Sequence, residues 1–191
     1  MKKLCIALTG GMGCGKSIAS KAFADLGVHI EDADKLAHKA LNQSPKVREE
    51  ICQLFGDVYT NGCADRKAIA KQVFADRNKL EALEKILHPA VEEMWQQQAD
   101  KHDILIVEVP LLYEKRLESK FDLCICVYCS DELRRNRLSQ RGMTAEEISA
   151  RDAFQMQPKQ KAMLADIVLF NESSTEFLKM QAARILSRLT K

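Results

Sequence analysis

The chain has 191 residues, of which 46% are hydrophobic, and its 29 Lys and Arg residues against 27 Asp and Glu residues leave a formal net charge of +2. This length predicts one hydrophobic core with elaborations, so we expect a single domain over residues 1–191. The balanced charge gives no reason to expect binding to nucleic acid or to a membrane surface. No stretch approaches the roughly 20 apolar residues of a membrane span.

The cysteines and the N-terminus favour a cytoplasmic protein. Seven cysteines are scattered along the chain, an odd number that fits reduced thiols better than a disulfide framework. The opening sequence MKKLCIAL imitates a secretory signal, but its apolar run is shorter than the roughly 7–15 residues that such a signal needs.

Five short apolar runs have the length of β-strands, and helical patterns lie between them. The runs cover residues 4–8, 28–30, 104–109, 123–128 and 167–170. Each run is continuous rather than alternating, which is typical of strands buried on both faces of a parallel sheet. The alternation therefore predicts an α/β fold with a doubly wound, five-stranded parallel sheet. The first helix is expected over residues 16–26, before Gly27, and the last over residues 174–189.

Two longer helical stretches interrupt this alternation. Residues 35–101 are too long for a minimal crossover, so we expect a helical insert beside the sheet. Within it, an apolar stripe recurs at spacings of three and four residues, and Pro89 predicts a break or a new helix start. Residues 131–164 form a second helix-rich stretch, which carries the densest arginines.

The stretch LTGGMGCGKS matches the phosphate-binding pattern G-x-x-x-x-G-K-[ST] and lies between a predicted strand and a predicted helix. Its backbone N–H groups and the helix N-terminus can cradle phosphates, Lys16 can reach the β and γ phosphates, and the Ser17 hydroxyl can bind Mg²⁺. The stretch predicts ATP binding through Gly11, Met12, Gly13, Cys14, Gly15, Lys16, Ser17 and Ile18.

The remaining motifs favour a small-molecule kinase over a GTPase switch. A switch needs D-x-x-G and N-K-x-D motifs, and the closest string, NKLE, lacks the Asp. A kinase needs a carboxylate near the acceptor hydroxyl. Asp32 and Asp34 follow the second strand and, on an extended strand end, point towards one site. The alternative is that an Asp here caps the following helix.

Three arginines in the helix predicted after the fourth strand are candidates for binding the transferring phosphoryl group. Arg134, Arg137 and Arg141 are spaced by three and four residues, so they share one helix face. Like charges at this spacing repel unless an anion visits. The alternative is a solvated basic face that Asp131 and Glu132 relieve.

Six stretches in order resemble the dephospho-coenzyme A kinase family, which is related to the nucleoside monophosphate kinases. They are LTGGMGCGKS, FADLGVHIEDAD, DRKAIAKQVFAD, LEKILHPAV, EVPLLYE and ADIVLFN, and together they span nearly the whole chain. The resemblance implies an enzyme that phosphorylates the ribose 3′-hydroxyl of dephospho-coenzyme A with ATP and Mg²⁺.

The resemblance also implies roles for individual residues. Asp34 would be the base for the 3′-hydroxyl, with Asp32 beside it, and Arg66 and His88 would lie in the coenzyme pocket. Glu108 would take the place of a Walker-B carboxylate at the Mg²⁺ site. Pro110, Leu111 and Leu112 would line the acceptor site, although plain core packing is the alternative for either leucine.

For the arginine-rich stretch, the resemblance implies a mobile lid over residues 131–164 in which Arg137 and Arg141 act. Many family members carry Gln where Arg134 stands, so Arg134 receives no role. Asn171 would lie near the adenine base.

Two alternatives stay open, and one cysteine adds a hypothesis. The chain could be another small-molecule or nucleotide kinase of this architecture, or a non-catalytic nucleotide-binding module. No obligatory protein partner is evident. Cys14 lies at a helix N-terminus, which lowers the pKa of a thiol. We therefore expect that alkylation of Cys14 inactivates the protein and that ATP protects it.

Overall fold

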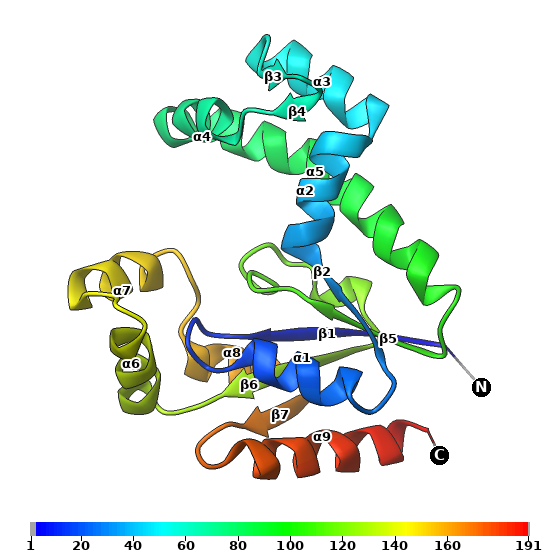
Figure 1. The fold of residues 1–191 in the computed structure, drawn as a ribbon, viewed down its shortest axis with the longest axis vertical. Helices are drawn as coiled ribbons and strands as arrows, with labels where there is room; N and C mark the ends of the chain where they lie inside the picture. The colour runs from blue at the N-terminus through cyan, green and yellow to red at the C-terminus, as the bar shows by residue number, and fades with distance from the viewer. Residues whose placement is uncertain (1–2, 191) are drawn as a thin grey trace. The chain divides into compact units, whose positions relative to one another are not determined.

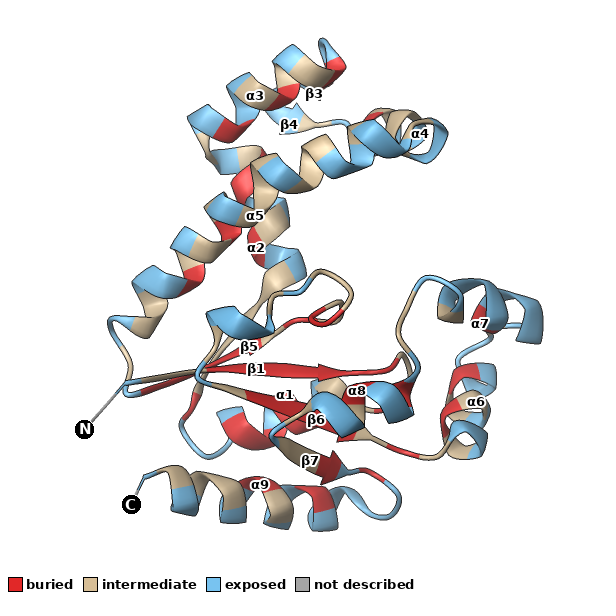
Figure 2. Cartoon of the chain, turned by 180° about the vertical axis from the view of Figure 1, so that it is seen from behind, coloured by how far each residue is buried: buried red, intermediate tan, exposed pale blue. Residues whose placement is uncertain are grey.

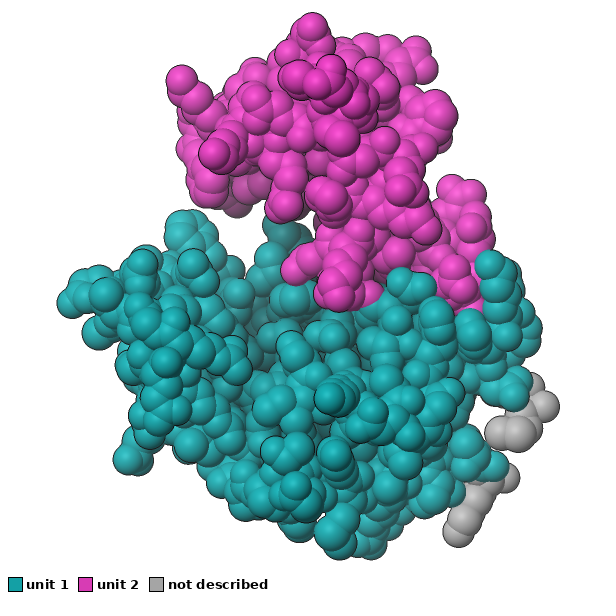
Figure 3. Space-filling model, viewed as in Figure 1, with its two compact units in different colours: residues 1–31, 99–191 teal, residues 32–98 magenta. Residues whose placement is uncertain are grey.

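The structure is a computed structural model that describes residues 3–190, and it divides into two compact units. The first unit holds the residues up to Glu31 and those from Ala99 onward, and the second unit is Asp32–Gln98 (Figure 3).

The first unit is built on a five-stranded sheet with the strand order β2-β5-β1-β6-β7. The strands are β1 (Leu4–Gly10), β2 (His29–Asp32), β5 (Ile104–Glu108), β6 (Leu123–Tyr128) and β7 (Ile167–Phe170). The pairs β1–β5, β1–β6 and β6–β7 are parallel. This confirms the predicted α/β class and all five predicted strands, because continuous apolar runs are what a sheet buried on both faces requires.

Helices cover both faces of this sheet (Figures 1 and 2). Helices α1 (Lys16–Ala24) and α9 (Thr175–Leu189) lie on one face, where Ile6 and Leu8 of β1 join Phe23 and Leu178 in the main core. Helix α8 (Pro158–Leu164) packs against β1 and β6 on the other face. The remaining helices of the unit are η1 (Glu118–Lys120), α6 (Asp131–Gln140) and α7 (Ala145–Asp152).

The second unit is mainly helical but contains a hairpin that the sequence analysis missed. Its elements are α2 (Ala33–Gln43), α3 (Pro45–Phe55), β3 (Tyr59–Thr60), β4 (Cys63–Ala64), α4 (Arg66–Ala75) and α5 (Arg77–Ala99). Strands β3 and β4 are antiparallel and are joined by Asn61 and Gly62, whose φ angles are 51° and 82°. Asn-Gly is the strongest short hairpin signal, because both central residues of such a turn need positive φ.

The prediction for Pro89 is wrong, because α5 continues through it. A proline inside a helix loses one backbone hydrogen bond and crowds the preceding turn. Val91 and Trp95, one turn apart on the same helix, are both buried, and this packing offsets the local cost. Among the residues that the structure describes, no helix is long and apolar enough to cross a membrane.

Candidate active site

The phosphate-binding loop joins β1 to α1 and needs glycine at several positions. Gly13 and Gly15 have φ angles of 82° and 99°, in the region that favours glycine. A Cβ on Gly15 would lie 2.1 Å from Nδ2 of Asn171, and one on Gly10 would lie 2.4 Å from the carbonyl oxygen of Val127. The loop backbone therefore approaches its neighbours too closely for any other residue.

Lys16 folds back over this loop. Its Nζ donates hydrogen bonds to the carbonyl oxygens of Gly10 at 2.9 Å and Gly11 at 3.4 Å. Burial lowers the pKa of Lys16, with the Lys161 charge adding to this effect and Glu108 opposing it. A cation that is partly desolvated and bonded only to carbonyl oxygens is well placed to gain from an incoming phosphate.

The residues expected to hold Mg²⁺ lie in this same region. Ser17 is exposed in the first turn of α1, and Glu108 ends β5 opposite Leu8 of β1. Glu108 is close enough to Lys16 for its charge to act on the lysine. A hydroxyl and a carboxylate beside a phosphate cradle suit a cation that prefers oxygen ligands. No group of three or more His, Cys, Asp or Glu side chains within residues 3–190 could hold a metal ion by itself.

Asn171 supports the loop from the end of β7, and Arg137 of α6 holds Asn171 in turn. Nδ2 of Asn171, which is only 3% exposed, donates to the Cys14 carbonyl oxygen at 2.9 Å. Arg137 donates through one terminal nitrogen to the Asn171 carbonyl oxygen at 3.0 Å, while its other terminal nitrogen is buried with no partner in the described part of the chain. An unpartnered guanidinium nitrogen fits an anionic ligand. Arg141 is exposed at the C-terminal end of α6.

The Cys14 side chain does not face a phosphate site, because it is fully buried. Its Sγ would lie 3.2 Å from a Cβ on Gly11, beneath the loop. A hydrogen bond from the Cys129 thiol lowers the pKa of Cys14, and Lys16 and Arg134 add smaller effects in the same direction, whereas burial acts against them. The pKa of Cys14 is thus lowered in the expected direction, but by Cys129 and not by the helix N-terminus, and the complete burial of the thiol argues against the expected reactivity.

Cys14 should therefore resist alkylation. We expect iodoacetamide to label Cys14 of the native protein at least about tenfold more slowly than the exposed Cys63, because labelling must wait for the loop to open. Peptide mass spectrometry over a time course measures both rates in one sample, and labelling of denatured protein provides the control. Equal native rates would contradict the buried position.

The loop after β5 is fixed by a buried ion pair that the sequence analysis did not predict. The Nζ of Lys161, which is fully buried on α8, lies 2.8 Å from Oε1 of Glu114 and donates to the Pro110 carbonyl oxygen at 2.6 Å. Glu114 also accepts a hydrogen bond from the Met156 backbone N–H at 2.7 Å. Leu112, expected to line the acceptor site, is fully buried, so that prediction is corrected in favour of core packing.

Removing one member of this pair should destabilise the protein strongly. For Lys161→Met we expect the free energy of unfolding to fall by about 3–5 kcal/mol, because the Glu114 carboxylate then stays buried without its partner. Urea unfolding measures the loss. The double variant Lys161→Met/Glu114→Leu should recover much of the stability. A single variant as stable as the wild type would show that the pair is not formed.

The two aspartates after β2 have different surroundings. Asp32 caps α2, because its Oδ1 accepts hydrogen bonds from the backbone N–H groups of Asp34 at 3.0 Å and Lys35 at 3.1 Å. Asp34 lies in the first helical turn and is exposed. The prediction that both side chains point the same way from an extended strand end is therefore wrong, because the chain becomes helical between them. The capping alternative applies to Asp32.

The second unit contains a cavity of about 420 Å³ that Asp34 helps to line. Asp34, His38 and Arg66 supply its polar groups. The remaining lining residues are apolar and come from α2, α4 and α5: Ala37, Leu41, Ile69, Ala70, Val73, Phe74, Leu83 and Leu87. His88, predicted to lie in the coenzyme pocket, is not among the residues that line this cavity. A mainly apolar pocket with a few polar groups is typical of small-molecule binding.

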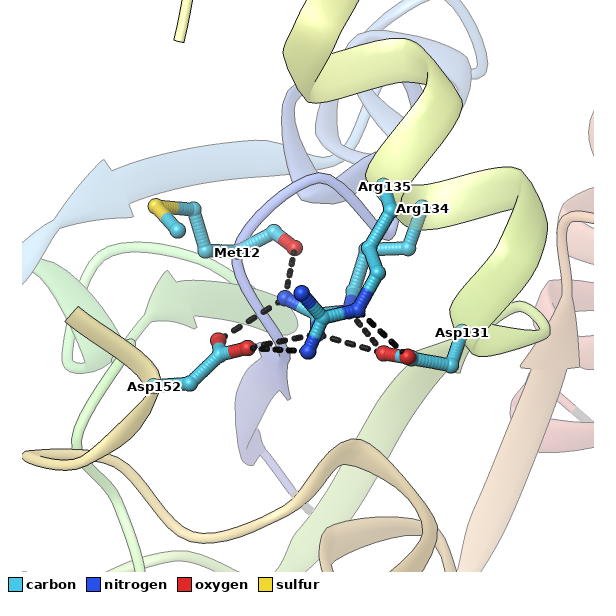
Figure 4. Close-up of polar contacts among 5 residues, drawn as sticks. All are labelled: Met12, Asp131, Arg134, Arg135 and Asp152. Atoms are coloured by element: carbon cyan, nitrogen blue, oxygen red, sulfur yellow. Dashed lines mark hydrogen bonds and ion pairs between the residues drawn. The ribbon is translucent and has the colours of Figure 1, made fainter. Parts of the chain in front are cut away.

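Arg134, which received no role from the sequence, is fully buried next to the phosphate-binding loop. It contacts Asp131, Asp152 and the Met12 carbonyl oxygen (Figure 4). Asp152 lies 18 residues further along the chain, and Met12 lies 122 residues earlier. No local sequence pattern relates residues at such separations, so these contacts could not have been predicted.

Comparisons with known proteins agree with this geometry. The family model described as Dephospho-CoA kinase matches residues 4–176. The dephospho-CoA kinase of Aquifex aeolicus is 36% identical over 97% of this chain and 97% of its own length. That of Anaeromyxobacter dehalogenans is 36% identical over 96% of this chain and 91% of its own length.

Solved structures lead to the same family. The dephospho-CoA kinase from Campylobacter jejuni superposes with a TM-score of 0.74 at 26% identity, over 99% of this chain and 98% of that one. A shikimate kinase from Acinetobacter baumannii, at 14% identity and a TM-score of 0.55, covers 98% of this chain and 93% of its own and shows the shared fold alone. The family model and the relatives confirm the resemblance found in the sequence: the chain belongs to the dephospho-CoA kinase family.

Proposed function

We propose that this protein transfers the γ-phosphoryl group of ATP to the ribose 3′-hydroxyl of dephospho-coenzyme A. Membership of the family is the observation that carries the proposal. The phosphate loop with its partly desolvated Lys16 supports the ATP half of the reaction. The largely apolar cavity lined by Asp34 and Arg66 supports the acceptor half, because the acceptor combines a long, weakly polar arm with an anionic nucleotide.

Within this proposal, each predicted residue has a task set by its surroundings. Lys16 and the unpartnered nitrogen of Arg137 would neutralise charge on the transferring group, with Arg141 joining them from the end of α6. Asp34 would accept the proton of the 3′-hydroxyl. Ser17 and Glu108 would hold Mg²⁺, which supplies further neutralisation of the phosphate charge.

The proposal includes a cytoplasmic enzyme that acts without a protein partner or nucleic acid. All seven cysteines are free thiols, as expected in a reducing compartment.

A panel of acceptors with a coupled ADP-release assay tests the proposal. We expect ADP release to be stimulated by dephospho-coenzyme A and not by adenosine, AMP, shikimate or gluconate. Mass spectrometry of the product should show one added phosphoryl group. Phosphorylation of another acceptor, together with no ADP release in the presence of dephospho-coenzyme A, would favour a different small-molecule kinase. ATP binding with no stimulated ADP release by any acceptor would favour a nucleotide-binding module.

A further inference from the structure

The guanidinium of Arg134 has a complete set of hydrogen bonds to groups of the protein. Nε and one terminal nitrogen donate to Oδ1 of Asp131 at 3.1 and 2.5 Å. The two terminal nitrogens donate to the carboxylate oxygens of Asp152 at 2.8 and 2.7 Å, and one of them also donates to the Met12 carbonyl oxygen at 3.4 Å. A guanidinium has five N–H donors, and here they make five hydrogen bonds to four acceptor atoms.

This saturation distinguishes Arg134 from its neighbour one helical turn away. Arg137 keeps a buried terminal nitrogen with no partner in the described residues, whereas Arg134 has no donor left for a phosphate. Arg135 completes the balance of charge, because it lies 2.6 Å from Asp131 and 3.6 Å from Asp152. Two cations thus face two carboxylates. Arg134 is therefore built to hold protein groups in place and not to contact the nucleotide.

The groups that Arg134 holds belong to three different segments (Figure 4). Asp131 is the first residue of α6, Asp152 is the last residue of α7, and Met12 lies in the phosphate-binding loop. The loop also packs on the stem of the arginine, since a Cβ on Gly13 would lie 3.0 Å from its Cγ. The position of the Met12–Gly13 turn therefore depends on Arg134, and the position of Arg134 depends on the carboxylate of Asp152.

We propose that Arg134 is a positioning residue that fixes the Met12–Gly13 turn of the phosphate-binding loop and ties the lid helix α7 to it through Asp152. The inference rests on the proposed use of ATP at this loop. Loss of the link leaves the turn free to move, so the N–H groups that cradle the phosphates are no longer preorganised. ATP affinity falls as a result, while the acceptor cavity in the second unit keeps its own lining.

Two variants separate positioning from folding. Arg134→Met leaves two carboxylates without their main partner, so it can destabilise the protein. The double variant Arg134→Met/Asp152→Asn removes one cation and one carboxylate together and leaves no side-chain donor for the Met12 carbonyl oxygen, and Asp131 keeps its ion pair with Arg135. Arg135→Gln is the matched control, because Arg135 contacts the same two carboxylates but not the loop.

The test measures ATP binding by isothermal titration calorimetry, together with KM for ATP and for dephospho-coenzyme A. We expect the double variant to weaken ATP binding at least about tenfold and to raise KM for ATP equally, with the acceptor KM unchanged. Arg135→Gln should stay within about twofold of the wild type, a normal effect for an exposed pair. Arg134→Lys should not restore affinity, because a lysine cannot supply the planar fork of donors.

Hydrogen exchange supplies a readout that a merely structural loss would not produce. In the double variant the amides of the Met12–Gly13 turn should exchange faster, while those of β1 keep their protection. Wild-type ATP affinity in the double variant would overturn the inference, and so would an equal loss in Arg135→Gln. Because ATP binding is measured without an acceptor, failure of the proposed acceptor leaves this test intact.

Discussion

Replacement of Lys16 by alanine is expected to lower kcat at least about 10²–10³-fold, the usual loss for one group that stabilises transition-state charge. The physical reason is the position of Nζ, which is partly buried and bonded to the carbonyl oxygens of Gly10 and Gly11. In the transition state of phosphoryl transfer, charge spreads over the phosphoryl oxygens, and we expect the lysine to neutralise it without reorganisation of solvent.

Steady-state ADP release with dephospho-coenzyme A measures this loss. Lys16→Arg should not rescue the rate, because the wide guanidinium does not replace a compact ammonium under a tight loop. Lys21→Ala is the control, since Lys21 is exposed in the last turn of the same helix. A kcat of Lys16→Ala within about twofold of the wild type would remove Lys16 from the reaction.

The second large effect is expected for Asp34→Asn, for which kcat should fall about 10²-fold, at the lower end of general-base effects. The loss should be smaller than that of Lys16→Ala, because the transition state is loose and proton removal can lag behind bond breaking. The substitution keeps the size of the side chain, and the cap on α2 stays in place because Asp32 provides it.

The measurement is kcat together with KM for each substrate, and KM for ATP should not change. Asp57→Asn, on an exposed loop of the same unit, is the control for loss of a carboxylate. Asp32→Ala should instead lower the stability of the protein by about 1 kcal/mol, the usual cost of a lost helix cap. If Asp34→Asn turns over like the wild type, Asp34 is not the base.

The sheet could be predicted because its strands are continuous apolar runs, and the phosphate-binding loop because its spacing is nearly unique. The hairpin was missed although Asn61-Gly62 is a clear signal, because the surrounding helical periodicity dominated the interpretation. The break predicted at Pro89 is wrong because the packing of Val91 and Trp95 outweighs the tendency of proline to end a helix.

The supporting contacts of the site were beyond sequence reasoning. The bonds from Asn171 to Cys14 and from Lys161 to Pro110 join residues 157 and 51 positions apart. Such pairs arise only when the sheet brings strand ends together. Arg134 and Arg137 lie one helical turn apart but differ in their hydrogen bonds. The donors of Arg134 are all used, whereas one terminal nitrogen of Arg137 has no partner in the described residues, and this difference likewise depends on tertiary contacts.

The chain leaves the first unit at the end of β2 and returns to it before β5, and these two strands are neighbours in the sheet. Both connections between the two units thus join the sheet at its β2–β5 edge, and neither is made at β1, β6 or the phosphate-binding loop. The segment that we propose to bind the acceptor is thus a single continuous insertion between two neighbouring strands. Under the proposed function, we expect a chimera that exchanges Asp32–Gln98 for the corresponding segment of another kinase of this fold to use the acceptor of that kinase, while the phosphate-binding loop keeps its own sequence.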